Sequence, residues 1–322
     1  MLTRQLGDTH HVVTRIGLGL AALGRPGYIN IGHHSDLTGR TEVRALEAHA
    51  HNVLSAAYDA GIRYFDVARS YGGGEEFLGR WLFASRVTDP TVTISSKWGY
   101  KYVADWRVDA EVHEVKDHSW ECLDVQYEES RSRLGRHIDI YQVHSATLDS
   151  GVLDNTAVLD HLAEIRSEGV TIGISTSGPE QARTIRKAMT IERGGQRLFS
   201  TFQTTWNLLE QSAGEALAEA HESGFGVIIK EAVANGRLTD RDRGTTAPLR
   251  GAYPDSNPDT IAVAAILAQP WADTVISGAA TVEQLESNVA ALDVDADSLV
   301  HLAEVAEDPQ TYWQKRSQLK WT

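Results

Sequence analysis

Cysteine is the scarcest residue in this chain of 322 residues, because Cys122 is the only one. One cysteine excludes an intramolecular disulfide and argues against a metal site built on thiolates. The adjacent pairs His10-His11 and His33-His34 make only a weak metal signal on their own. We therefore predict that these histidines are solvated and that the protein holds no metal ion.

Long hydrophobic runs and basic charge are scarce as well. The longest apolar stretch, about residues 260–272, is too short to span a bilayer, and the first residues contain no apolar core of signal-peptide length. We therefore expect a cytoplasmic protein that contacts no membrane. Lysine and arginine number 30 against 44 aspartates and glutamates, and a formal charge of −14 repels nucleic acid. A small molecule is the expected partner, and the sequence does not indicate an oligomeric state.

Eight short apolar or β-branched runs recur along the chain, and segments of helical periodicity separate them. This alternation predicts parallel strands joined by right-handed crossovers, and eight units predict closure into a barrel. No Gly-x-Gly-x-x-Gly motif follows a strand and opens a helix, which argues against a doubly wound dinucleotide fold. We predict an α/β protein with a single (β/α)8 TIM-barrel domain over residues 1–322. The predicted strands are Val13–Leu18, Tyr64–Val67, Val92–Ser96, Ile138–Val143, Val170–Ser175, Phe199–Gln203, Gly226–Ile229 and Thr274–Ser277.

Helix starts and loop lengths add detail to this architecture. Thr281–Gln284 and Ser177–Glu180 each fit a capping box, and Pro258 stands at the first position of another predicted helix. Two connections, about residues 98–120 and 231–257, are longer than most loops in compact domains. Both follow a predicted strand, so we expect them to lie over the face where barrel enzymes keep their active sites.

Polar residues close three consecutive predicted strands. Asp66 ends the second, Tyr71 follows it in a glycine-rich turn, Lys97 ends the third and His144 ends the fourth. A barrel brings these ends to one rim, where Lys97, held by Asp66, should lower the pKa of the Tyr71 phenol. A neutral His144 can donate an N–H to a substrate carbonyl oxygen while Tyr71 supplies a proton. The reaction then needs a nicotinamide cofactor as its hydride source.

Five segments, in order between about Thr14 and Ala291, resemble the aldo-keto reductase superfamily. They are Phe65-Asp-Val-Ala-Arg-Ser-Tyr-Gly72, Ser95-Ser-Lys-Trp98, Asp139-Ile-Tyr-Gln-Val-His144, Phe202-Gln-Thr-Thr-Trp-Asn207 and Ile276-Ser-Gly-Ala with Glu283-Gln-Leu and Asn288. The resemblance implies a barrel enzyme that reduces aldehydes or ketones with NADPH, less often NADH, or oxidises alcohols and sugars in reverse. It also implies that Asp66, Tyr71, Lys97 and His144 form the catalytic tetrad, with Tyr71 as general acid and base.

The same resemblance implies which residues hold the nicotinamide half of the cofactor. Ser175 and Gln203 would contact the carboxamide, and Thr176 stands where the family usually has asparagine. Lys230 stands where many members have an aromatic side chain that stacks on the ring. An ammonium beside a ring that becomes cationic should disfavour the oxidised cofactor, unless Glu231 neutralises it.

The resemblance places Gly278, Gln284 and Asn288 around the adenine half, and it implies NADP(H) in preference to NAD(H). Ala280 stands where a basic residue often binds the 2′-phosphate. Arg237 or another cation of its loop is then the candidate for that contact.

Simpler interpretations and other functions remain open at this point. Asp66 and Lys97 can be a structural ion pair, Gln284 a helix cap, and Ser175 and Gln203 partners of backbone groups at strand ends. A regulatory subunit that binds the cofactor without turnover is one alternative function. A Schiff-base lyase or isomerase that uses Lys97 or Lys230 is another.

Overall fold

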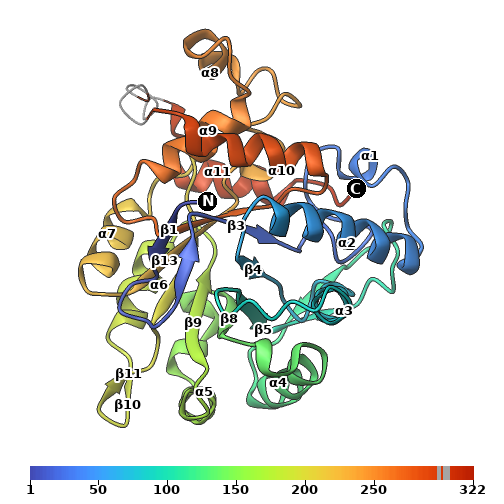
Figure 1. The fold of residues 1–322 in the computed structure, drawn as a ribbon. Coiled ribbons are helices and arrows are strands. Elements are labelled where there is room, and N and C mark those ends of the chain that lie inside the picture. The colour runs from blue at the N-terminus through green and yellow to red at the C-terminus, as the bar shows by residue number, and fades with distance from the viewer. Residues whose placement is uncertain (296–298, 300–304) are drawn as a thin grey trace.

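The computed structural model describes residues 1–295, 299 and 305–322, and its centre is a closed ring of eight parallel strands with helices around it (Figure 1). Each strand pairs in parallel with both neighbours, and the ring closes where β14 pairs with β3. This confirms the predicted TIM barrel. The barrel strands are β3 (Ile16–Gly19), β4 (Tyr64–Asp66), β5 (Thr93–Trp98), β8 (Ile140–Ala146), β9 (Thr171–Thr176), β12 (Thr201–Thr205), β13 (Gly226–Lys230) and β14 (Thr274–Ser277).

The helices connect successive strands and cover the outside of the ring. As predicted, α10 begins behind Thr281, whose Oγ1 accepts the backbone N–H of Gln284, and Pro258 opens α9. The prediction of a capping box at Ser177–Glu180 is wrong, because α6 begins at Gln181 without a side-chain cap. The helices are α1 (His33–Asp36), α2 (Val43–Asp59), α3 (Gly74–Ala84), α4 (Trp120–Leu134), α5 (Thr156–Ser167), α6 (Gln181–Met189), α7 (Gly214–Glu222), α8 (Ala247–Ala252), α9 (Pro258–Leu267), α10 (Val282–Val289) and α11 (Pro309–Ser317).

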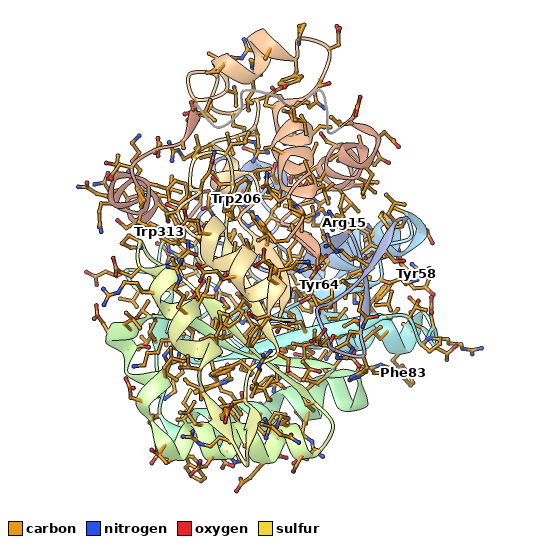
Figure 2. All side chains as sticks on the ribbon, turned by 90° about the vertical axis from the view of Figure 1, so that its left-hand side faces the viewer. Arg15, Tyr58, Tyr64, Phe83, Trp206 and Trp313 are labelled. Carbon is orange, nitrogen blue, oxygen red and sulfur yellow. The ribbon has the colours of Figure 1, made fainter. Side chains whose placement is uncertain are left out.

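An N-terminal hairpin of β1 (Thr3–Gln5) and β2 (Val12–Thr14) adjoins the barrel base, where Asp8 N donates to the carbonyl of Gly224 just before β13. The sequence predicted one continuous strand over Val13–Leu18, and this is wrong. The chain changes pairing partners at Arg15. The guanidinium of Arg15, which is labelled in Figure 2, binds the carbonyl of Leu267. Residues before Arg15 pair with β1, and those after it enter the ring.

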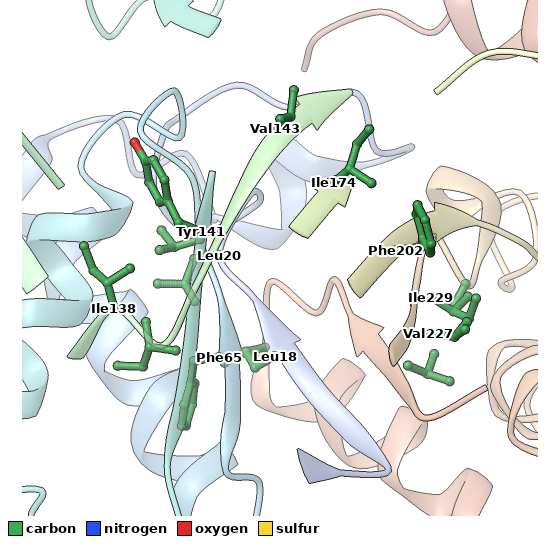
Figure 3. Close-up of a cluster of buried hydrophobic side chains, with 14 of the residues drawn as sticks. Leu18, Leu20, Phe65, Ile138, Tyr141, Val143, Ile174, Phe202, Val227 and Ile229 are labelled. Carbon is green, nitrogen blue, oxygen red and sulfur yellow. The ribbon is translucent and has the colours of Figure 1, made fainter. Parts of the chain in front are cut away.

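Side chains of the strands alternate between two hydrophobic layers, as expected for a pleated barrel. Those in Figure 3, such as Phe65 and Val227, point from successive strands toward the surrounding helices. Their neighbours Tyr64 and Ile228 instead pack inside the ring, with Leu6 of the hairpin segment. The base of the barrel is therefore filled with apolar side chains, which leaves the opposite mouth for chemistry.

The two long connections are partly ordered by secondary structure of their own. Residues 98–120 contain a hairpin of β6 (Tyr100–Tyr102) and β7 (Glu114–Lys116), and residues 231–257 contain the turn η4 (Ala234–Gly236) and α8. Helix α8 lies at the outer edge of the molecule (Figure 1). The remaining short elements are the hairpin β10 (Glu192–Arg193) with β11 (Gln196–Arg197), and the turns η1 (Gly135–His137), η2 (Leu148–Ser150), η3 (Val152–Asp154) and η5 (Ala290–Asp293).

Two of the histidines expected to be solvated are buried. His11 contacts Thr171 Oγ1 at 2.9 Å, and His33 has no exposed surface. Burial lowers the pKa of each to about 4, so both are neutral at pH 7. Within the described ranges, no three His, Cys, Asp or Glu side chains gather as metal ligands would. No helix found there has the length and apolar character needed to cross a membrane.

Candidate active site

The four polar residues predicted at the strand ends meet at the barrel mouth. Lys97 Nζ donates to Asp66 Oδ2 at 2.5 Å and to the carbonyl of Val67 at 2.8 Å. The same ammonium lies 3.5 Å from Tyr71 Oη, and Tyr71 Oη lies 3.5 Å from His144 Nε2. One phenol therefore contacts an ammonium on one side and an imidazole on the other.

A β-bulge at the end of β8 places His144 in this mouth. Between the pairs Val143↔Ile174 and Ala146↔Thr176, β8 has one residue more than β9, and Ser145 takes a positive φ of 51°. An extra residue bends a strand and redirects its side chains. Ser175 Oγ accepts the backbone N–H of Ser145 at 3.3 Å, so it holds the bulge in place.

Burial sets the protonation states of the phenol and the imidazole. Burial, and then the Asp66 carboxylate, raise the pKa of Tyr71 well above its usual value. This is opposite to the predicted direction, because burial of the phenol and the Asp66 carboxylate outweigh the nearby cation Arg25, which lowers the pKa. Burial and the cations Lys97 and Lys230 hold the pKa of His144 well below its usual value. At neutral pH Tyr71 is thus a protonated acid, and His144 is a neutral imidazole.

A cavity of about 300 Å³ opens above these side chains, and Tyr71, His144 and Gln203 are among its lining residues. Gln203 Nε2 donates to Asp66 Oδ1 at 2.8 Å. Lys230 reaches the cavity from the end of β13, where its ammonium donates to Thr205 Oγ1 at 2.8 Å.

The carboxylate of Glu231 lies between two cations. It is 3.7 Å from Lys230 Nζ and forms a bidentate pair with Arg316 of α11. Burial lowers the pKa of Lys230 to about 8, with Arg316 adding to that effect. Although burial opposes it, Arg316 and Lys230 hold the pKa of Glu231 at about 2. Glu231 is therefore ionised and offsets part of the cationic charge beside the cavity.

A second group of side chains surrounds Tyr71 and was not predicted from the sequence. The fully buried Arg25 lies 5.2 Å from the centre of the Tyr71 ring and 4.7 Å from that of Trp321. Its guanidinium binds Glu114 of the long 98–120 connection at 2.7 Å, and His113 stacks on Trp321 with ring centres 4.1 Å apart. These residues come from three distant segments, and no sequence spacing links them.

A second cavity of about 250 Å³ continues from the first, since Asn30, Val233, Gly278 and Asn288 line both. The predicted cofactor residues Gln203 and Lys230 line the first cavity, Gln284 lines the second, and Gly278 and Asn288 line both. Two neighbouring cavities that share lining residues make one trough, and five of the predicted cofactor residues line it.

Three of the predicted cofactor residues are not among the described residues that line either cavity. Ser175 is fully buried beneath the bulge, and Thr176 contacts Thr204 Oγ1 at 3.1 Å. Arg237 forms a bidentate pair with Glu307 at 2.6 and 3.0 Å. Their proposed contacts with a cofactor remain predictions.

Two side chains that line the first cavity have unsatisfied polar atoms, which favours a polar occupant. The Nδ1 atom of His144 and the Oδ1 atom of Asn235 are buried and have no hydrogen-bond partner among the described residues. A Cβ added at Gly278 would have no atom within 4 Å, so this wall stays open. These features and the donor set at the mouth fit a nicotinamide dinucleotide.

Two loops whose residues line both cavities, one after β3 and one after β13, contact each other. Ile31 N donates to the carbonyl of Asn235 at 3.0 Å, and Arg241 Nη1 donates to Asp36 Oδ2 at 2.8 Å. The loop after β3 and the loop after β13 are thereby joined by one backbone contact and one ion pair. We call these two contacts the loop bridge.

Known proteins resemble the chain along most of its length. The sequence model of the Aldo/keto reductase family matches residues 15–307. The uncharacterized oxidoreductase YqkF of Bacillus subtilis (strain 168) is 24% identical over 320 residues, which cover 90% of this chain and 91% of YqkF. The L-glyceraldehyde 3-phosphate reductase of Escherichia coli (strain K12) is 26% identical over 346 residues, with 94% and 93% covered. The solved holo structure of aldo-keto reductase AKR11C1 from Bacillus halodurans shares the fold, with a TM-score of 0.72 at 22% identity over 96% of this chain and 97% of that one.

Proposed function

The chain belongs to the aldo/keto reductase family, and from this premise we propose that it interconverts a carbonyl group and an alcohol with NAD(P)H. The substrate class is an aldehyde, a ketone or a sugar. The observation that most supports this is the position of Tyr71 Oη, which lies 3.5 Å from both Lys97 Nζ and His144 Nε2 at the wall of a cavity.

Each of the four residues has a role that follows from its contacts. The protonated phenol of Tyr71 donates its proton to the substrate oxygen as negative charge develops there. The neutral imidazole of His144 donates an N–H to the same oxygen and orients it. Lys97 stabilises the phenolate that remains, and Asp66 fixes the Lys97 ammonium through their 2.5 Å contact.

A bound nicotinamide dinucleotide supplies the hydride in reduction and accepts it in oxidation. Gln203 and Lys230 would hold its nicotinamide end, and Gly278, Gln284 and Asn288 would hold its adenosine end. The aromatic side chains of Tyr28, Tyr100 and Trp321 line the first cavity and would exclude water from the reacting oxygen.

The Schiff-base alternative receives no support from Lys97, because its ammonium lies within hydrogen-bond distance of Asp66, Val67 and Tyr71. Borohydride trapping with candidate carbonyl compounds tests Lys230 separately. We expect no trapped adduct, and an adduct on Lys230 would favour imine chemistry instead.

A panel of aldehydes, ketones and sugars tests the proposal directly. The full chain is mixed with each compound and with NADH or NADPH, and loss of the reduced nicotinamide absorbance is followed. We expect turnover of at least one compound class. Tight nucleotide binding without turnover across the panel would favour the regulatory-subunit alternative.

A further inference from the structure

The second cavity has a strongly acidic lining. Its charged lining residues are the carboxylates Asp36, Asp240, Asp259 and Glu283 and a single guanidinium, that of Arg241. This end of the trough therefore has an excess of negative charge, within a chain whose formal charge is already −14.

The guanidinium of Arg241 is already engaged. It forms a bidentate pair with Asp36 in the loop bridge and also donates to the carbonyl of Ile31. Arg250 pairs in turn with Asp240. Each of these cations thus has a carboxylate partner before any ligand arrives.

The other two carboxylates have no such partner. Asp259 Oδ2 accepts a hydrogen bond from Asn288 Nδ2 at 3.0 Å, and Glu283 stands in the first turn of α10. Neither forms an ion pair with a lysine or arginine of the described chain. Both therefore present acceptor oxygens and negative charge to an occupant.

Neither the usual basic position, Ala280, nor the predicted substitute Arg237 supplies a cation for a phosphate here, and the loop cation that lines the cavity, Arg241, is already paired. Ala280 is fully buried, and its backbone N–H donates to Gln284 Oε1 at 2.8 Å. Arg237 binds Glu307 and does not line the cavity. Among the described residues that line this cavity, Arg241 is the only arginine or lysine, and it is paired with Asp36.

A buried amide points independently to an occupant. Asn235 is 4% exposed, lines the first cavity and donates through Nδ2 to Asn30 Oδ1 at 3.3 Å. Asn30 lines both cavities, so this pair stands where they join. Asn235 Oδ1 has no partner, and a ligand that passes between the cavities can satisfy it.

We propose that the second cavity selects an adenosine ribose with a free 2′-hydroxyl, so that the protein binds NAD(H) in preference to NADP(H). Carboxylates accept hydrogen bonds from ribose hydroxyls, as in other NAD-binding sites. A 2′-phosphate carries a charge of about −1.5 to −2 at neutral pH, and the acidic lining repels it. The inference rests on the proposed function, and it runs opposite to the cofactor preference that the family resemblance implies.

Equilibrium binding tests this preference without any turnover. The full chain is titrated with NADH and with NADPH while its tryptophan fluorescence is followed, and Trp321 lines the first cavity. We expect the Kd of NADH to be lower by about tenfold or more, an effect expected of like charges held close together. The fragments 5′-AMP and 2′,5′-ADP should show the same order by calorimetry. Equal affinity, or tighter binding of NADPH, would overturn the inference, and binding of neither dinucleotide would instead defeat the proposed function.

Charge reversal on α10 gives the matched variants. Glu283→Arg should tighten NADPH binding by about tenfold, whereas Glu286→Arg, an exposed site on the same helix outside the cavity, should change it by less than about twofold. Glu283→Gln should give a smaller gain in the same direction. An equal gain from Glu286→Arg would show that overall charge, and not the cavity, sets the preference. Circular dichroism of each variant verifies folding.

Discussion

Tyr71 is the proposed general acid, and its hydroxyl contacts both Lys97 and His144. In Tyr71→Phe the ring keeps its place beside Arg25 while the hydroxyl is lost, so we expect kcat to fall by about 10²- to 10⁴-fold. The Kd of the reduced nucleotide should change by less than about twofold, because the ring stays. Steady-state kinetics and fluorescence titration measure the two effects, and a fully active variant would remove Tyr71 from its role.

Lys230 gives the cavity a pH dependence. Its pKa of about 8 means that the ammonium is present below pH 8 and is lost above it. A cationic nicotinamide ring should therefore bind more tightly as pH rises from about 7 to about 9, by roughly threefold to tenfold. The reduced nucleotide, whose nicotinamide ring is uncharged, serves as the internal control. In Lys230→Met the affinity for the oxidised nucleotide should no longer change with pH. If the variant keeps the same pH profile, a group other than Lys230 is responsible for it.

The polar residues at the ends of β4, β5 and β8 were predictable one by one, whereas the residues around them were not. Asp66, Lys97 and His144 each interrupt an apolar run, and a barrel leaves such positions one common rim. Arg25, Glu114 and Trp321 come together only through loop conformation, which has no periodic pattern. The raised pKa of Tyr71 was also missed, because burial cannot be read from the order of residues.

At the scale of elements, the bulge in β8 depends on one hydroxyl. Ser175→Ala removes the bond to Ser145 N, so we expect His144 to lose its fixed position and kcat to fall by about threefold to thirtyfold. Ser175 lines neither cavity, so the Kd of the nucleotide should stay within about twofold. The opposite result, weaker binding at unchanged kcat, would support the carboxamide contact that the family resemblance implies.

Asp139 links β5 and β8 at the closed end of the barrel, where its Oδ2 accepts the backbone N–H of Ile94 at 2.7 Å. Burial raises its pKa from 3.8 to about 6, so the folded state binds more protons than the unfolded state between these values. The free energy of unfolding should thus fall as pH rises from about 4 to about 6. In Asp139→Asn this part of the fall, about 2 kcal/mol, should be absent. Urea unfolding at several pH values measures it, and parallel curves for the two proteins would contradict it.

The barrel itself followed from hydrophobic patterning, because eight runs of strand length separated by helical segments leave few other arrangements. The split at Arg15 did not follow, since Val12–Thr14 and Ile16–Gly19 are both β-prone and differ only in their pairing partners. The Ser177–Glu180 motif likewise satisfied a local rule that the observed start of α6 did not use.

Across the whole molecule, Arg316 joins α11 to the end of β13, 85 residues earlier in the chain. Arg316→Met should leave the Glu231 carboxylate with Lys230 alone and lower the free energy of unfolding by about 2 kcal/mol. The control is Arg183→Met, because Arg183 pairs with Glu180 and these side chains are 70% and 50% exposed. Loss of this pair should lower the free energy of unfolding by less than about 1 kcal/mol. Urea unfolding compares both variants, and equal losses would contradict a special role for the buried pair.

The loop bridge should affect how fast a bound nucleotide dissociates. The contacts Ile31–Asn235 and Asp36–Arg241 join two loops whose residues line both cavities, so a nucleotide held between these loops would leave only after the contacts separate. Opening of such loops often takes longer than the chemical step. When nucleotide is bound before the substrate is mixed in, the first turnover would then outpace all later ones, and the size of that initial burst would count the sites that were loaded.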